Sequence, residues 1–117
     1  MIPPEFINTV TIGPCQNLML LLPDNCIHLT VTSPPYGELR NYNGYQFEFE
    51  KIADQLFRVT RPGGVLVWVV ADETEDGNES GESMRQALYF KSIGFKLYDT
   101  MIYSKSGFRF PRPRAYH

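Results

Sequence analysis

The segment Thr32-Ser33-Pro34-Pro35-Tyr36 is the part of the chain whose residue types and order point most clearly to chemistry. Two consecutive prolines fix the backbone and push the residue before them into an extended conformation. They also remove two backbone N–H donors, which leaves the carbonyl groups of this stretch as a row of acceptors. Such a turn suits a planar ring that carries an amino group. Tyr36 would stack on the ring, while Ser33 and a proline carbonyl would accept the hydrogens of the amine.

The motif stands at the end of a β-rich run. Ile27–Thr32 (IHLTVT) predicts a strand that Ser33-Pro34-Pro35 closes abruptly. Open α/β sheets place their ligands at the carboxyl ends of strands, so this position favours a functional site. A Pro-Pro turn that only terminates a strand is the alternative interpretation at this level.

The rest of the chain alternates between β-rich runs and helical stretches. Strands are predicted at 7–12, 27–32, 65–71 and 95–103, and helices at 16–22, 45–60 and 83–93. We expect 27–32, 65–71 and 97–104 to be neighbouring strands of one sheet. Val65–Ala71 (VLVWVVA) is a continuous apolar run, which is typical of a strand covered on both faces. The predicted fold class is therefore α/β with a mostly parallel sheet.

Helical spacing of apolar residues identifies the faces that should be buried. In the helix at 45–60 these residues are Phe49, Ile52, Ala53, Leu56 and Phe57. In the helix at 83–93 they are Met84, Ala87, Leu88 and Ile93, with Gly94 as the cap.

Length and composition set the broad class. The chain has 117 residues, of which 43% are hydrophobic, and this fits one small domain over residues 1–117. No apolar run reaches the roughly 20 residues of a membrane span. Two cysteines, Cys15 and Cys26, make neither a disulfide framework nor a zinc site. We expect a cytoplasmic protein with no metal site.

The charges are unevenly distributed. All thirteen acidic residues lie within residues 1–99, and six of them fall within residues 72–82, a stretch that reads as an exposed loop. Residues 100–117 carry four bases and no acid: Lys105, Arg109, Arg112 and Arg114. This basic tail is either a solvated end or a contact for an anionic partner such as DNA.

The order of these features resembles the amino-group DNA methyltransferases, which modify cytosine N4 or adenine N6. TSPPYG after a β-rich strand is similar to motif IV of that family, and the approach to it, from Pro23 to Val31, looks like the usual one. Residues 49–64 look like the family's next helix and turn, and 92–105 like a later helix end and strand. The resemblance covers residues 7–110.

The resemblance implies a Rossmann-like sheet of the class I methyltransferases and S-adenosyl-L-methionine as cofactor. It implies methyl transfer to a base flipped out of DNA. In the catalytic turn, Ser33 would accept a hydrogen bond from the amine, the Pro34 carbonyl would accept another, Pro35 would lock the turn and Tyr36 would stack on the base. Ser at the first motif position is commoner among the cytosine-N4 enzymes of the family, so the favoured target is N4 of cytosine.

Two departures from the family pattern concern the cofactor. The glycine-rich loop (F-x-G-x-G) is missing, and only 32 residues precede Ser33, which matches the permuted order in which the catalytic half comes first. We therefore expect an incomplete fold, a fragment that needs a C-terminal half or a second chain, with a homodimer as another possibility. Gly13-Pro14-Cys15 stands where many relatives carry Gly-Asp-Cys. By resemblance, the cofactor contacts of this chain would be Gly13, Cys15 and Pro34.

Several functions stay open on the sequence. The favoured one is the catalytic part of a DNA (cytosine-N4) methyltransferase of a restriction-modification system. An N6-adenine enzyme and a non-catalytic remnant that binds DNA or a partner chain are the main alternatives. A methyltransferase of protein glutamine or RNA is a third, against which Ser33 argues because those enzymes carry Asn in front of the prolines.

Overall fold

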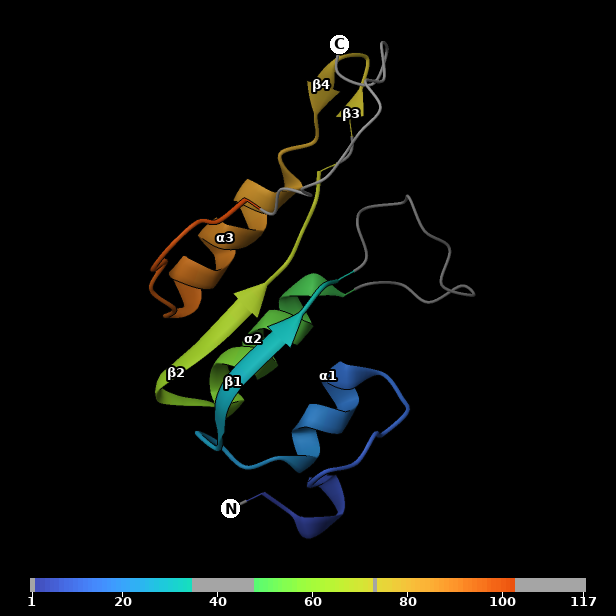
Figure 1. The fold of residues 1–117 in the computed structure, drawn as a ribbon, viewed down its shortest axis with the longest axis vertical. Helices are drawn as coiled ribbons and strands as arrows, with labels where there is room; N and C mark the ends of the chain where they lie inside the picture. The colour runs from blue at the N-terminus through green and yellow to red at the C-terminus, as the bar shows by residue number, and fades with distance from the viewer. Residues whose placement is uncertain (1, 35–47, 73, 103–117) are drawn as a thin grey trace, which may run out of the picture.

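The computed structural model describes residues 2–34, 48–72 and 74–102. Two parallel strands, β1 (Ile27–Thr32) and β2 (Thr60–Trp68), form a sheet, and α2 (Phe49–Val59) connects them. The last long element is α3 (Glu82–Ile93), which follows a short hairpin of β3 (Thr74–Glu75) and β4 (Asn78–Glu79). Figure 1 shows β1 and β2 running side by side in the same direction. The α/β class expected from the sequence is confirmed.

The two strands are in register from Leu29↔Val65 to Thr32↔Trp68. An additional pair, Ile27↔Thr60, precedes a register shift, because residues 61–64 loop out between the two pairings. These residues include Pro62-Gly63-Gly64, which the sequence predicts to lie before the strand. β2 therefore begins at Thr60 and ends at Trp68, whereas the predicted strand covers 65–71.

Helix α2 places its apolar side against the sheet and against α3. Ile52, Ala53, Leu56 and Val59 are buried, as expected from their spacing. Phe57 is 41% exposed, but its ring packs edge-on against Phe95 at a centroid distance of 5.2 Å. The core thus forms on the face of α2 that the sequence predicts.

Helix α3 buries only part of the expected face, because Ile93 packs against the core as predicted but Met84 and Leu88 do not. Its buried residues are Gln86 and Phe90, whereas Met84 and Leu88 are each 65% exposed. Phe90 contacts the Trp68 ring at a centroid distance of 5.0 Å, and the Trp68 indole N–H donates a 2.9 Å hydrogen bond to the Gln86 side-chain oxygen. A buried glutamine is stable here because it satisfies the indole donor, and an aromatic side chain fills the core instead of Leu88.

Hydrogen bonds from Arg58 hold the N-terminal region against α2. This region contains η1 (Pro4–Phe6), α1 (Cys15–Leu18) and η2 (Met19–Leu21), close to the predicted helix at 16–22. Arg58 donates hydrogen bonds to the carbonyl groups of Met19 (2.6 Å) and Leu22 (2.9 Å) and to the Asp24 carboxylate (2.7 Å). These three bonds hold the end of η2 on α2.

The strand predicted at 7–12 does not form. The chain turns through η1, and Asn8 takes a left-handed conformation with φ 56°. Val10 and Ile12 are 92% and 94% exposed. The β-branched composition of this segment is real, but a strand also needs a hydrogen-bonded neighbour, and none of the described strands pairs with it.

The strand predicted at 95–103 is likewise absent from its described part, residues 95–102. The chain leaves α3 at Gly94, where the Phe95 N–H bonds to the Phe90 carbonyl at 3.0 Å, and it then runs without strand pairing. The neighbouring-strand prediction is therefore confirmed for 27–32 and 65–68 and wrong for 97–102. Residues 103 and 104 lie outside the described residues.

The acidic stretch forms a tight hairpin rather than an open loop. β3 and β4 are antiparallel and joined by Asp76-Gly77, both with positive φ (55° and 75°), as in the two-residue turns that favour Asp-Gly. In the described residues, no helix is long and apolar enough to cross a membrane.

Candidate functional site

The carboxyl ends of β1 and β2 lie side by side, and the motif predicted to be catalytic begins at the end of β1. The Thr32 carbonyl accepts a 2.9 Å hydrogen bond from the Val69 N–H, so pairing continues to the last residue of β1. Ser33, which comes next, is exposed, and Pro34 is buried. Pro34 is thus buried next to the end of β1, and Ser33 is exposed at the carboxyl edge of the sheet.

The remaining predicted residues of the motif and of the basic tail are not placed. Pro35 and Tyr36 lie outside the described residues, as do the four bases Lys105, Arg109, Arg112 and Arg114. Their roles remain predictions from the sequence.

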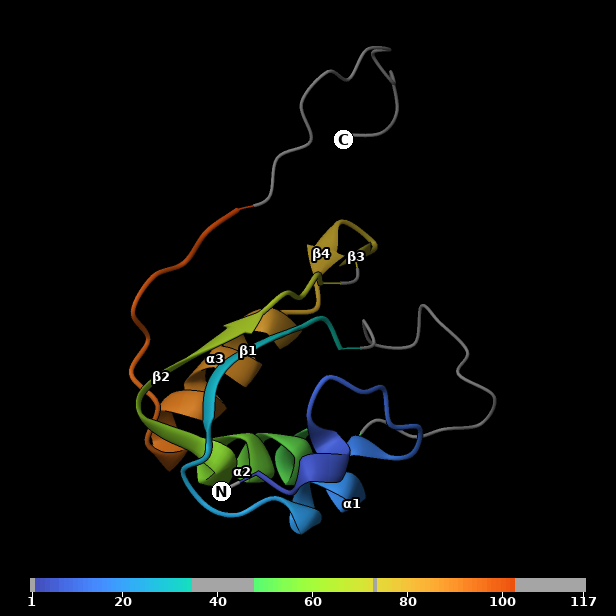
Figure 2. The same cartoon turned by 60° about the horizontal axis from the view of Figure 1, so that its bottom comes forward.

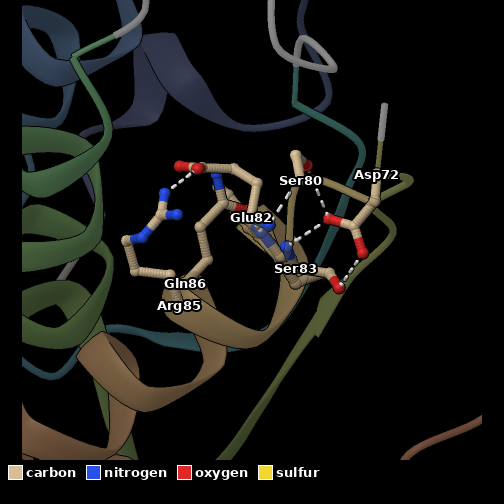
Figure 3. Close-up of polar contacts among 7 residues, drawn as sticks. Asp72, Ser80, Glu82, Ser83, Arg85 and Gln86 are labelled. Atoms are coloured by element: carbon tan, nitrogen blue, oxygen red, sulfur yellow. Dashed lines mark hydrogen bonds and ion pairs between the residues drawn. The ribbon is translucent and has the colours of Figure 1, made fainter. Parts of the chain in front are cut away.

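The same edge of the sheet receives the beginnings of both long helices. α2 returns from the end of β1 to the start of β2, so its first turn stands near the motif (Figure 1). α3 is brought to the end of β2 by Asp72, whose carboxylate accepts hydrogen bonds from the Ser83 N–H and the Ser83 hydroxyl, both at 2.7 Å. Figure 3 shows the Asp72 carboxylate held between Ser80 and Ser83.

Asp72 is a capping residue that the sequence does not reveal. The Ser83 backbone N–H and hydroxyl hold the pKa of the Asp72 carboxyl below its usual value. Asp72 lies eleven residues before Ser83. The sequence therefore does not distinguish it from the other five acids of residues 72–82. No local capping signature has such a spacing. Asp72 and Ser83 come together because the chain between them reverses direction in the β3–β4 hairpin.

Replacing Asp72 with Ala should lower the free energy of unfolding at neutral pH by about 1 kcal/mol, as loss of a helix cap does. Because the folded pKa lies below the ordinary value of 3.8, the contribution is present above that pH and is lost as the pH falls through the folded pKa. Urea unfolding of the wild type and of Asp72→Ala, at neutral pH and at a pH below 3.8, measures this. A difference between the two proteins that did not shrink at the acid pH would contradict the assignment.

An open groove of about 410 Å³ lies between the first turns of α2 and α3. Its walls are Glu48, Phe49, Glu50, Lys51, Glu82, Arg85, Gln86 and Tyr89. Ion pairs join Lys51 to Glu48 and Arg85 to Glu82. A hydrogen bond to Asp54 raises the pKa of Tyr89 to about 12, so this phenol stays protonated at neutral pH. The groove opens beside the edge of the sheet, but Ser33 does not line it.

The residues proposed to contact the cofactor lie close to the same edge. The Gln16 amide donates a 2.9 Å hydrogen bond to Glu48, which immediately precedes α2, so the start of α1 reaches the start of α2. Gly13 has φ 149°, and a Cβ there would lie 3.2 Å from the Leu18 side chain. Cys15 is exposed, but partial desolvation raises the pKa of its thiol, so it carries little thiolate at neutral pH.

Among the described residues, therefore, the structure places Ser33 and Pro34 at the end of β1 and links the start of α1 to the residue before α2, and it does not join these two groups by a printed contact. Cys15 is the first residue of α1, and Gly13 lies two residues before it. The described part of the chain holds no group of three His, Cys, Asp or Glu residues arranged to bind a metal ion.

Comparison with known proteins identifies the chain. The sequence profile of the N6/N4 methylases, described as DNA methylase, matches residues 27–117. The chain belongs to the N6/N4 DNA methylase family. The matched region starts with β1 and includes the whole Ser33–Tyr36 motif.

Relatives of this chain in Bacillus are methyltransferases by name. The orphan methyltransferase M.BamHII of Bacillus amyloliquefaciens is 61% identical over 94 residues, which are 80% of this chain and 36% of M.BamHII. The type II methyltransferase M.BglII of Bacillus subtilis is 32% identical over 102 residues, 79% of this chain and 28% of M.BglII. The chain thus spans about a third of the length of these relatives.

A solved structure has the same fold as this chain. TTHA0409 from Thermus thermophilus, a putative DNA modification methylase in complex with S-adenosyl-L-methionine, superposes with a TM-score of 0.55 at 22% identity. The match covers 87% of this chain and 57% of that one. The described sheet and helices therefore have a Rossmann-like α/β fold, as part of that larger structure does.

Proposed function

We propose that this chain is the catalytic segment of a DNA methyltransferase that transfers a methyl group from S-adenosyl-L-methionine to N4 of cytosine. The observation that carries the proposal is the exposed Ser33 beside the buried Pro34, at the carboxyl end of β1 in a chain of the N6/N4 DNA methylase family. Ser at the first position of the motif favours cytosine. N6 of adenine is the alternative target.

Methyl transfer to an exocyclic amine requires hydrogen-bond acceptors for the amine more than it requires a strong base. The lone pair of an exocyclic amine is conjugated with the base ring and must be freed before the nitrogen can attack an electrophile. Hydrogen bonds from the amine to the Ser33 hydroxyl oxygen and to the Pro34 carbonyl favour the pyramidal nitrogen of the transition state.

Residues other than Ser33 and Pro34 would bind the target base and the DNA backbone. Tyr36 would stack on the flipped-out base, and Pro35 would restrict the backbone between Pro34 and Tyr36. The basic tail residues Lys105, Arg109, Arg112 and Arg114 would contact phosphates, which contributes affinity without reading the sequence.

The methyl donor brings an electrophilic methyl group on a sulfonium, which is activated before it binds. Gly13, Cys15 and Pro34 fit one side of a site for it, because Gly13 presents bare backbone and Cys15 is exposed close to the edge where Ser33 stands. Pro14 provides no carboxylate, and the printed sequence has no F-x-G-x-G loop. The other contacts would come from a further part of the fold, on the same polypeptide or on a second chain.

The 117-residue chain alone should therefore bind S-adenosyl-L-methionine poorly. Isothermal titration calorimetry with the cofactor should give no saturable heat at micromolar concentrations. A dissociation constant of about 1 µM or lower would contradict this and would mean that the residues present suffice for the cofactor site.

The proposed function is tested by a chimera in which this chain replaces the matched segment of M.BamHII, the relative with 61% identity over 94 residues. The chimera should transfer tritiated methyl groups from the donor to duplex DNA. The matched control is the same chimera with both Ser33→Ala and Tyr36→Ala. A folded chimera without methyl transfer, or a double variant with full transfer, would reject the proposal.

A further inference from the structure

The groove between the first turns of α2 and α3 contains the side-chain amide of Gln86. Figure 2 shows both helices on the same side of the two strands. Gln86 is only 3% exposed, and its side-chain oxygen accepts the 2.9 Å hydrogen bond from the Trp68 indole. Within residues 2–34, 48–72 and 74–102 its side-chain nitrogen has no hydrogen-bond partner, whereas every fully buried side-chain nitrogen or oxygen there has one. The Gln86 nitrogen therefore reaches the surface of the groove as an unused donor.

Glu82 supplies an acceptor on the same face of α3. It lies one helical turn before Gln86, at the spacing at which side chains on a helix are neighbours. Arg85 pairs with one carboxylate oxygen of Glu82, as Figure 3 shows. In the described part of the chain the other carboxylate oxygen has no partner. A donor and an acceptor thus stand next to each other in one wall of the groove.

The other walls of the groove restrict the ligand that this pair can bind. The half-buried rings of Phe49 and Tyr89 meet edge-on at a centroid distance of 5.5 Å, and they offer an apolar surface to a planar group. The charged side chains of the groove include one more acid than bases, which disfavours an anionic ligand; they are Glu48, Glu50, Glu82, Lys51 and Arg85. A neutral planar ring that carries an acceptor next to a donor fits these groups best.

We propose that this groove is a second nucleobase site, which takes an unpaired cytosine or adenine of the nucleic acid substrate. Both bases carry a ring nitrogen next to an exocyclic amine. The ring nitrogen accepts a hydrogen bond from the Gln86 amide, the amine donates one to Glu82, and the ring lies against Phe49 or Tyr89. Thymine has a ring N–H where these bases have an acceptor, so it leaves the Gln86 donor unpaired. The inference rests on the proposed function only for the source of the base, and Ser33 does not line this site.

The test is a titration of the isotope-labelled 117-residue chain with free deoxynucleosides, which requires no methyl transfer. Two-dimensional proton–nitrogen NMR spectra report the side-chain amide of Gln86 and the indole N–H of Trp68, the one tryptophan of the sequence. Deoxycytidine and deoxyadenosine should shift both signals, with a dissociation constant of about 1 mM. Thymidine should bind roughly 10-fold more weakly or worse, because a site built around a hydrogen bond rejects a ligand that leaves it unmade.

Two variants with the same change of charge locate the contact. Glu82→Ala removes the acceptor beside Gln86 and should weaken the binding of deoxycytidine about 10-fold. Glu50→Ala is the matched control, because Glu50 lines the same groove from α2 and is not a neighbour of Gln86 on α3. It should change the dissociation constant by less than about 2-fold. Neither change removes a buried side chain, and circular dichroism confirms that each variant is folded.

The proposal is overturned if the Gln86 and Trp68 signals do not shift, if thymidine binds as tightly as deoxycytidine, or if Glu82→Ala binds as well as Glu50→Ala. Tighter binding of S-adenosylhomocysteine than of deoxyadenosine would overturn it in favour of the adenine of the cofactor. Nucleoside binding as expected, together with a chimera that transfers no methyl group, would count against the proposed function and not against this site.

Discussion

Replacing Ser33 with Ala in the M.BamHII chimera should lower the rate of methyl transfer about 100-fold, or roughly 2.7 kcal/mol in the barrier. The change removes an acceptor that matters most when the amine nitrogen becomes pyramidal, so DNA affinity should change little. Ser33 is exposed at the end of β1, and its loss therefore leaves no cavity in the core. Single-turnover methyl transfer and DNA binding, measured on the same preparation, separate the two effects.

Ser33→Asn is the informative companion variant, because the adenine enzymes of the family carry Asp or Asn at this position. Its side-chain carbonyl restores an acceptor, so it should recover part of the rate that Ala loses. Equal rates for Ser33→Ala and the parent chimera would remove Ser33 from the mechanism. A parallel loss of DNA affinity and rate would make its role one of binding.

Replacing Gly94 with Ala should produce the largest loss of stability, about 3 kcal/mol, from backbone strain and overpacking together. Gly94 ends α3 with φ 130°, a conformation that side chains disfavour. A Cβ at this position would lie 2.5 Å from the Phe57 ring, which is itself packed against Phe95. Both the ring and the end of the helix would have to move.

Gly77→Ala is the matched control for the strain alone. Gly77 has φ 75° in the β3–β4 turn, and a Cβ there would meet nothing within 4 Å. It should cost only about 1 kcal/mol. Urea unfolding of both variants at the same pH measures the difference, and equal losses would show that the Phe57 ring does not restrict this site.

The sequence predicts best the elements whose pattern agrees with their surroundings. The nearby sequence is enough to predict β1 and α2. β1 is a β-branched run that ends before Ser33-Pro34. α2 is an amphipathic helix, and its predicted face buries Ile52 and Leu56. Gly94 caps α3, as its position after an apolar periodic stretch suggests.

The failures share a physical cause, which is dependence on distant partners. Residues 7–12 and 97–102 have strand composition, but strands are stable only in a ladder, and neither segment has one in the described part of the chain. The predicted face of α3 is right for Ile93 and wrong for Met84 and Leu88, because Gln86 can be buried where it accepts a hydrogen bond from Trp68, a residue on another element. For the same reason the sequence does not identify Asp72 as the cap of α3.

The candidate site was predictable because its residues are contiguous. Ser33 and Pro34 follow β1 directly, so predicting that strand is enough to place them at the edge of the sheet. The approach of Gly13 and Cys15 to that edge depends instead on the Gln16–Glu48 hydrogen bond between residues 32 positions apart. No local pattern encodes that contact.

Identification of the methylated nucleoside tests the central claim most directly. Duplex DNA methylated by the chimera is digested to nucleosides and analysed by mass spectrometry, with the Ser33→Ala/Tyr36→Ala double variant as the blank. The account predicts N4-methylcytosine in the product of the parent chimera and none in that of the double variant. N6-methyladenine as the product would contradict the assignment of cytosine, and methylation that persisted in the double variant would contradict a catalytic role for the motif.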